Sequence, residues 1–201
     1  SGILLGENKQ YLVKSRLRRI MADNRFSSLG ELVQQLRRQP RSELRETVID
    51  AMTTNETLWF RDTHPFRILE ERLLGEMAGE DTSQPLRIWS AACSTGQEPY
   101  SIAMVIDEYR RRNPGRLRRP VEIIATDVAK PVVDAAKDGI YELLALGRGL
   151  SADRQKQYFT QLPSGSWQVR KEIRDMVTFR EHNLLERFNF GKFDIVFCRN
   201  V

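Results

Sequence analysis

Three segments of the chain carry residue types that suit a nucleoside ligand. Ser90–Pro99 is a loop of small residues between an apolar run and a predicted helix, and small side chains let a ligand approach the free N–H groups of a helix start. Asp127 ends a second apolar run, where its carboxylate could accept both hydroxyl hydrogens of a ribose. Asn183 and Leu184 follow a third run and could meet the edge of a base. Together the segments favour a nucleoside more than any one does alone.

Each segment also has a plainer structural explanation. The small-residue loop could be a tight turn that packs a helix on a sheet, because Gly96 is its only glycine and the dinucleotide-binding motif needs more. Asp127 could cap the following helix, and Asn183 with Leu184 could form an ordinary turn. The residue pattern alone therefore leaves the ligand open.

Composition and charge narrow the class of protein. Of the 201 residues 40% are hydrophobic, and the net charge is +5. Eight basic residues against two acidic ones lie between Lys14 and Arg41, which predicts an acidic partner such as a nucleic acid, an anionic membrane or an acidic protein surface. No apolar stretch approaches the ~18 residues of a membrane span, and the opening Gly2–Gly6 is too short for a signal sequence. We therefore expect a cytoplasmic protein without membrane insertion.

The cysteines and histidines exclude one class of site. Two of each are too few for a zinc site with the usual ligand spacing, so no metal is expected. Cys93 and Cys198 are expected to be small buried residues at strand ends.

The elements that must position these residues divide the chain in two. Residues 7 to about 78 predict helices around Val13–Met21, from Ser28 to Pro40, around Leu44–Met52 and from about Pro65. Ser28 with Glu31 predicts a capping box. Short connections between these segments predict a small helical bundle over residues 1–78.

Residues 79–201 predict an α/β domain. Apolar runs predict strands at 86–93, 121–127, 177–182 and 193–198, and helices are expected at 99–112 and 131–138. This alternation implies a parallel sheet with helices on both faces, whose ligands bind beyond the carboxyl ends of the strands. The three polar segments fall at those ends.

Residues from about 141 to 176 interrupt that alternation. They predict an inserted β-subdomain with a short helix capped by Ser151 and an antiparallel hairpin around Pro163 to Arg170.

Four motifs, in this order, resemble the CheR family, the chemotaxis-receptor glutamate methyltransferases. They are Met52–Asp62 (MTTNETLWFRD), Trp89–Ser101 (WSAACSTGQEPYS), Ala125–Asp127 (ATD) and Phe197–Val201 (FCRNV). The resemblance covers almost the whole chain. It implies an α/β fold class in which an N-terminal all-helical domain joins a Rossmann-like S-adenosylmethionine-dependent methyltransferase domain with a small inserted antiparallel β-subdomain.

The resemblance also implies the site. Carried over position by position, the family's S-adenosylmethionine pocket falls on Asn55, Thr57, Arg61, Glu98, Asp127, Asn183, Leu184, Arg199 and Asn200. Arg61 and Arg199 are the candidates to orient a substrate carboxylate or to line the site beside the sulfonium, although Arg61 could instead pair with Asp62 or Glu56. Since the first three pocket residues precede the sheet domain, we expect the linker between the domains to cover the cofactor.

The implied reaction moves a methyl group to a receptor glutamate and leaves S-adenosylhomocysteine. Glutamate has an ordinary pKa of about 4.3, so at neutral pH it needs no general base, and no metal is required. We expect Lys14, Arg16, Arg18 and Arg19 to dock the helical bundle of the receptor, although such residues usually form a solvated helix face.

Two other functions stay open from the sequence. One is a methyltransferase acting on nucleic acid, against which stands the lack of aromatic stacking residues on the basic face. The other is a regulatory module that binds the cofactor without activity.

The chain departs from the family at its C-terminal end. Its fourth predicted strand, with Ile195, Val196 and Phe197, is apolar on both faces, which suits a central strand and makes a poor edge. We therefore expect the C-terminal strands to be missing, the domain over 79–201 to be incomplete, and activity to belong to the longer parent. The short turn at Pro163 favours an enzyme that needs no receptor C-terminal pentapeptide as a tether.

Overall fold

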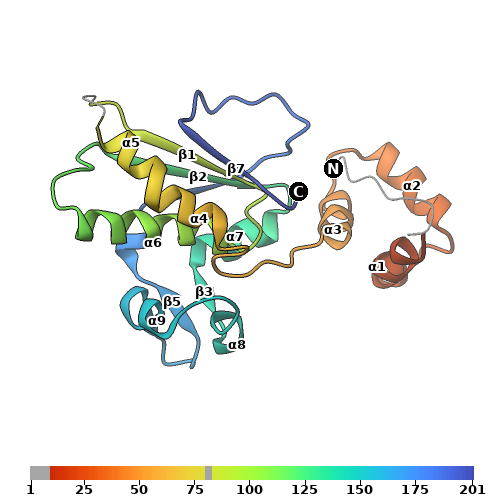
Figure 1. The fold of residues 1–201 in the computed structure, drawn as a ribbon. Helices are drawn as coiled ribbons and strands as arrows, with labels where there is room; N and C mark the ends of the chain where they lie inside the picture. The colour runs from red at the N-terminus through yellow and green to blue at the C-terminus, as the bar shows by residue number, and fades with distance from the viewer. Residues whose placement is uncertain (1–9, 80–82) are drawn as a thin grey trace.

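The computed structural model describes residues 10–79 and 83–201, which form a small helical unit and a larger α/β unit joined by an extended linker over residues 53–63 (Figure 1). The expected helix start at residue 7 lies outside the described residues, as do residues 80–82 just after the expected division at residue 78. Within these ranges no helix is both long and apolar enough to cross a bilayer.

The helical unit contains α1 (Gln10–Asp23), α2 (Leu29–Arg38) and α3 (Glu43–Met52), close to the predicted positions. Leu17, Ile20 and Leu32 form its buried core, and partly buried residues of α3 pack against them. The hydroxyl of Ser28 caps α2 by accepting the Glu31 N–H at 3.2 Å, as predicted. In a capping box the Glu31 carboxylate would accept from the N–H of Ser28, but here it accepts from the N–H and the hydroxyl of Ser27. The bond from the Ser27 hydroxyl is the main cause that lowers the pKa of Glu31.

The main sheet is parallel and has the order β6-β2-β1-β7. Its strands are β1 (Leu86–Ala91), β2 (Val121–Asp127), β6 (Val177–Glu181) and β7 (Ile195–Cys198), which confirms the four predicted strands. Ile88 lies in register with Ile123 on one side and with Ile195 on the other, and all three are buried. Paired residues of parallel strands point to the same face, so these side chains mark the core face of the sheet.

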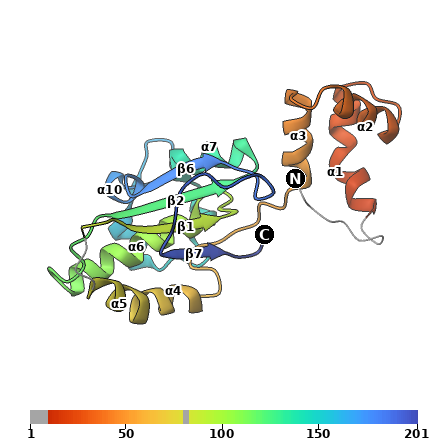
Figure 2. The same cartoon turned by 90° about the horizontal axis from the view of Figure 1, so that it is seen from above.

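Helices cover only this face among the described residues, whereas the sequence predicts helices on both faces. One continuous helical segment runs through α4 (His64–Ile68), the π-helical turn η2 (Leu69–Leu73) and α5 (Leu74–Ala78), and it is followed by α6 (Gln97–Arg112) and α7 (Lys130–Asp138). Figure 2 shows the strands crossing in front of α6. The ring of Phe66 on α4 lies 5.8 Å from that of Phe197 on β7.

The packing of residues 64–78 bears on the expected domain boundary. Phe66, Leu69 and Leu74 belong to the large core under the sheet and not to the core of the helical unit. The amphipathic pattern of this segment predicts a helix correctly, but it does not tell which core buries the apolar face. We propose that the division falls in the linker over residues 53–63, and not at residue 78.

The opposite face of the sheet is covered by the loop that leads from β6 to β7. Trp89 of β1 packs on Phe188 of this loop, with ring centroids 4.4 Å apart. Beyond the loop β7 is an edge strand, and its Val196 is 51% exposed while Ile195 and Phe197 are buried. Among the described residues this apolar strand thus occupies the edge position for which the sequence analysis found it poorly suited.

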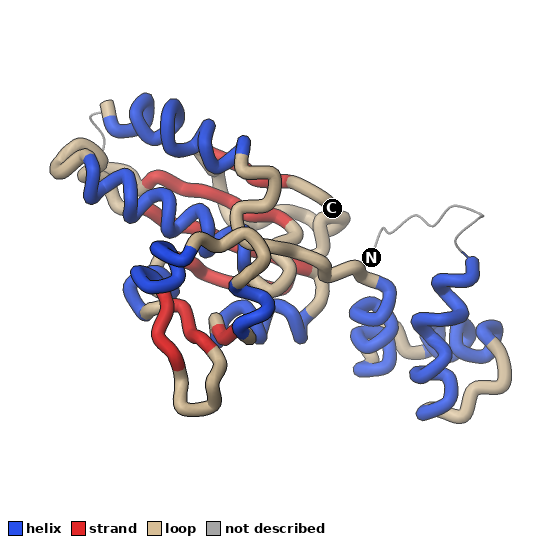
Figure 3. Tube along the Cα trace, turned by 60° about the horizontal axis from the view of Figure 1, so that its bottom comes forward, coloured by secondary structure: helices blue, strands red, loops and turns tan. Residues whose placement is uncertain are grey.

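The predicted insertion is present as a second, antiparallel sheet of order β3-β5-β4. It contains β3 (Ile140–Tyr141), β4 (Phe159–Gln161) and β5 (Trp167–Val169), with the short helices α8 (Leu143–Leu146), α9 (Ala152–Tyr158) and α10 (Lys171–Arg174). Ser151 caps α9 as predicted. Figure 3 shows the β4–β5 hairpin projecting from the body of the molecule.

The linker is fastened to this inserted sheet by Trp59, which is fully buried. Its ring lies edge-on to Tyr141 at 4.9 Å and to Phe159 at 5.3 Å, and its backbone N–H donates to the Arg148 carbonyl at 3.0 Å. Gly149 permits this approach. Its φ is +97°, and a Cβ there would lie only 2.1 Å from the Trp59 carbonyl oxygen.

We predict that Gly149→Ala destabilises the protein by about 2–3 kcal/mol, because it combines a left-handed backbone with a collision against the linker. Gly165→Ala is the matched control, since Gly165 has a φ of +91° and nothing lies within 4 Å of the position that its Cβ would take. The control should lose only about 1 kcal/mol of backbone strain. Urea unfolding measures both, and equal losses would show that the linker contact contributes nothing.

Candidate cofactor site

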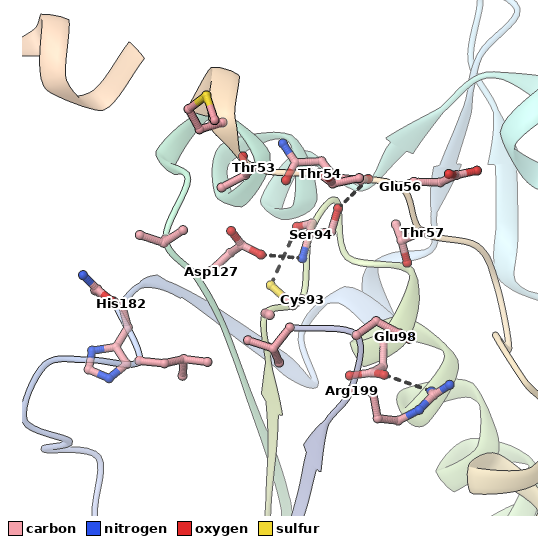
Figure 4. A pocket seen from close by; sticks show the side chains of 18 of the residues that line it. Thr53, Thr54, Glu56, Thr57, Cys93, Ser94, Glu98, Asp127, His182 and Arg199 are labelled. Atoms are coloured by element: carbon pink, nitrogen blue, oxygen red, sulfur yellow. Dashed lines mark hydrogen bonds and ion pairs between the residues drawn. The ribbon is translucent and has the colours of Figure 1, made fainter. Parts of the chain in front are cut away.

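A cavity of about 590 Å³ opens at the carboxyl ends of the main strands, under the linker (Figure 4). All nine residues expected at the cofactor pocket line it. They come from the linker, the start of α6, the end of β2 and the segments after β6 and β7. The topology thus brings together residues that are up to 145 positions apart, from Asn55 to Asn200.

Asp127 lies at the end of β2 and is only 7% exposed. One carboxylate oxygen accepts the Ser94 N–H at 2.8 Å, and the other accepts the Ala129 N–H at 3.1 Å. The capping explanation holds only in part, because Ala129 is the N-cap of α7 and the first helical turn receives no bond from Asp127. Since each carboxylate oxygen can accept more than one hydrogen bond, both keep capacity for a ligand hydroxyl.

Glu98 and Arg199 form an ion pair in the wall of the cavity. One oxygen of Glu98 accepts the Ser90 hydroxyl at 2.8 Å, and the other accepts Nη1 of Arg199 at 3.1 Å. Burial raises the pKa of the Glu98 carboxyl above its ordinary value, and the bonds from Ser90 and Arg199 offset this only in part. The Arg199 cation thus favours the charged form of Glu98, against the desolvation that favours the neutral acid.

The guanidinium of Arg199 bonds to several groups of the protein. Besides Glu98, its Nη2 atom donates to the Arg61 carbonyl at 2.8 Å and to the Asp62 carboxylate at 2.5 Å. The side chain is 17% exposed. Arg199 thus ties the end of β7 to α6 and to the linker.

Arg61 is engaged much more loosely. Its Nη1 atom donates to the Glu56 carbonyl at 3.1 Å, and the two carboxylates considered as ion-pair partners are bound elsewhere. Asp62 pairs with Arg199, and Glu56 pairs with Arg148. The alternative of a surface ion pair for Arg61 is therefore wrong, and the residue lines the cavity.

Asn183 and Leu184 line the same cavity as the linker residues. The side-chain oxygen of Asn183 accepts the Leu185 N–H at 3.1 Å, so the residue does form a turn, as its plainer explanation held. It lines the cavity as well, and the two interpretations of this segment are compatible.

Sequence reasoning missed several lining residues, among them Thr54, Cys93, Ser94 and His182. Cys93 and Ser94 lie in the small-residue loop, so the loop pointed to them without assigning them a role. Burial and the nearby charge of Asp127 raise the pKa of the Cys93 thiol, which stays neutral. Cys93 is buried as expected, whereas Cys198 is exposed, contrary to expectation.

The basic helix divides into inward and outward residues. Lys14, Arg18 and Arg19 are exposed. Arg16 instead is half-buried, and its guanidinium bonds to the last residue of α3 and to the linker. Since its guanidinium is already held by groups of the protein, we propose that Arg16 differs in role from the three exposed residues of the expected docking set.

Comparison with known proteins places this chain in a family. Residues 1–53 match the family model "CheR methyltransferase, all-alpha domain", and residues 55–201 match "CheR methyltransferase, SAM binding domain". The chain is 55% identical over its whole length to Chemotaxis protein methyltransferase Cher2 of Pseudomonas putida and, also at 55%, to Chemotaxis protein methyltransferase 1 of Pseudomonas aeruginosa, covering 73% of each. It is 37% identical to a Salmonella typhimurium chemotaxis protein methyltransferase, of which it covers 68%. The chain therefore belongs to the CheR family of S-adenosylmethionine-dependent methyltransferases.

Proposed function

We propose that this protein transfers a methyl group from S-adenosylmethionine to glutamate side chains of chemotaxis receptors, giving glutamate 5-O-methyl esters and S-adenosylhomocysteine. The observation that carries the proposal is the cavity in which Asp127, the Glu98–Arg199 pair and Arg61 meet beneath the linker. The relatives are named chemotaxis protein methyltransferases, and this supports a role in chemotaxis.

The residues of the cavity fit the cofactor. A cavity of about 590 Å³ lies within the ~300–1,000 Å³ range of small-molecule sites. The buried Asp127 carboxylate is fixed by two backbone N–H groups and can still accept ribose hydroxyls. The Glu98 side chain lies in the same wall, held by the Ser90 hydroxyl and by Arg199.

When bound, S-adenosylmethionine supplies an electrophilic methyl group on a cationic sulfur. The acceptor glutamate is ionised at neutral pH, so the protein needs no general base. The contribution of the protein is to align the glutamate with the methyl group and to exclude water. Arg61 is better placed than Arg199 to orient the incoming carboxylate, because Arg199 already holds two carboxylates. The neutral thiol of Cys93 does not compete for the methyl group, since the thiolate is the nucleophile.

The deciding experiment incubates the full-length protein with methyl-labelled S-adenosylmethionine and receptor cytoplasmic fragments. Base-labile methyl esters on receptor glutamates are the expected product. Cofactor binding without any methyl ester would instead favour a regulatory module, and label on added nucleic acid would favour the other alternative.

The first prediction on the proposed function concerns Asp127. Asp127→Ala should weaken S-adenosylmethionine binding by about 1–3 kcal/mol, because it removes the acceptor for the ribose and leaves buried N–H groups unpaired. Calorimetry on the full-length variant measures the loss. Asp134→Ala on the exposed face of α7 is the control for removal of one carboxylate, and it should bind normally. Normal affinity in a folded Asp127 variant would exclude this residue from the site.

The second prediction separates the two arginines. Arg61→Ala should lower the rate of receptor methylation and leave the unfolding midpoint near that of the wild type. Arg199→Ala should lower stability by about 1–3 kcal/mol, because Glu98 loses the cation that compensates its burial. That loss should shrink as the pH falls through the pKa of Glu98, since a neutral carboxyl needs no cation. The reverse pattern in the two variants would exchange their proposed roles.

The third prediction concerns receptor docking through the exposed residues of α1. Reversing the charge of Arg18 and Arg19 should raise the receptor KM, most strongly at low salt, with cofactor affinity unchanged. Arg116→Glu with Arg118→Glu makes the same change in net charge on the exposed loop between α6 and β2, and it should leave KM unaltered. Docking through α1 is refuted if both double variants behave alike.

A further inference from the structure

The guanidinium of Arg16 points from α1 into the protein, towards the linker. Its Nη1 atom donates to the carbonyl oxygens of Met52 at 2.7 Å and Thr53 at 3.3 Å, and its Nη2 atom donates to the Thr54 hydroxyl at 2.9 Å. One cation therefore holds three consecutive residues.

These three residues are the end of α3 and the start of the linker. The last carbonyls of a helix lack donors within the helix and carry partial negative charge, which a cation stabilises. α3 has no basic residue in its own last turn. Thr53 donates hydrogen bonds to the carbonyls of Ile49 and Asp50, and Arg16 donates one to the carbonyl of Met52. Arg16 thus caps α3 from a neighbouring helix.

The capped residues are also a wall of the cofactor cavity, which Met52, Thr53 and Thr54 line. The carbonyl of the next residue, Asn55, accepts the Ser94 hydroxyl at 2.9 Å. The N–H of Ser94 in turn donates to Asp127 at 2.8 Å, and Figure 4 shows these groups side by side. A continuous series of bonded neighbours therefore runs from α1 to the carboxylate proposed to hold the ribose.

We propose that Arg16 is a positioning residue for the cofactor, which fixes the Met52–Thr54 wall and so sets the affinity for S-adenosylmethionine. This inference rests on the proposed function and adds to it a role for the helical unit inside the cofactor site. It separates Arg16 from Arg18 and Arg19 on the same helix, which act on the receptor.

The test compares Arg16→Ala, Arg16→Lys and Arg18→Ala in the full-length protein. Calorimetry with S-adenosylhomocysteine should show about tenfold weaker binding for Arg16→Ala, which corresponds to ~1.4 kcal/mol. Arg16→Lys should recover part of the affinity, because an ammonium group can still bond to the Met52 carbonyl but cannot span to Thr54. Arg18→Ala removes the same charge from the same helix and should leave the Kd unchanged while raising the receptor KM.

Thr54→Val keeps the inference testable if Arg16→Ala fails to fold. It removes one acceptor of Arg16 with little change of shape, and by itself it should weaken cofactor binding. Where Arg16→Ala does fold, Thr54→Val should weaken binding less in that background than alone. Unchanged Kd values in both Arg16→Lys and Thr54→Val would overturn the inference, as would a rise in receptor KM alone in Arg16→Ala. If the wild type itself binds no S-adenosylhomocysteine, the proposed function fails instead.

Discussion

The burial of Trp59 is the contact on which the cofactor cavity depends. The linker has no regular structure of its own, so its path is determined by what holds its side chains. Trp59, fully buried against Tyr141 and Phe159, fastens its middle to the inserted sheet. At its start the Asn55 carbonyl is fastened to Ser94, and after Trp59 the Arg61 carbonyl is fastened to Arg199. A segment held in this way at three places can form one wall of a binding site.

Charged groups inside the site also hold several segments at once. Arg199 joins β7, the first turn of α6 and the linker through one guanidinium, and it offsets the desolvation of Glu98. Arg16 does the equivalent for the end of α3. Both arginines bond to the protein at several places, whereas Arg61, with one bond to the Glu56 carbonyl, is the more weakly held cation in the cavity wall.

The elements were predictable where periodicity is long and the cores are simple. The four strands and the long helices follow from apolar spacing, and the nine pocket residues from motif resemblance. The position of the division between the two units does not follow from the same pattern, because the spacing of Phe66, Leu69 and Leu74 shows that a face is buried but not which core buries it. The inward contacts of Arg16 do not follow from the pattern either, since its spacing resembles that of its exposed neighbours. The two-residue β3 has no period to detect, and it exists because β5 pairs with it.

The position of Trp59 also has a consequence for the order of folding. Its partners lie 82 and 100 residues further along the chain, so a ribosome must have made most of the α/β unit before Trp59 can be buried. Contacts of such long range close large loops and form late. The helical unit, whose core residues Leu17, Ile20 and Leu32 are close in sequence, can be complete long before. During synthesis the linker is therefore not yet packed against the inserted sheet, and the binding site is among the last parts of the molecule to form.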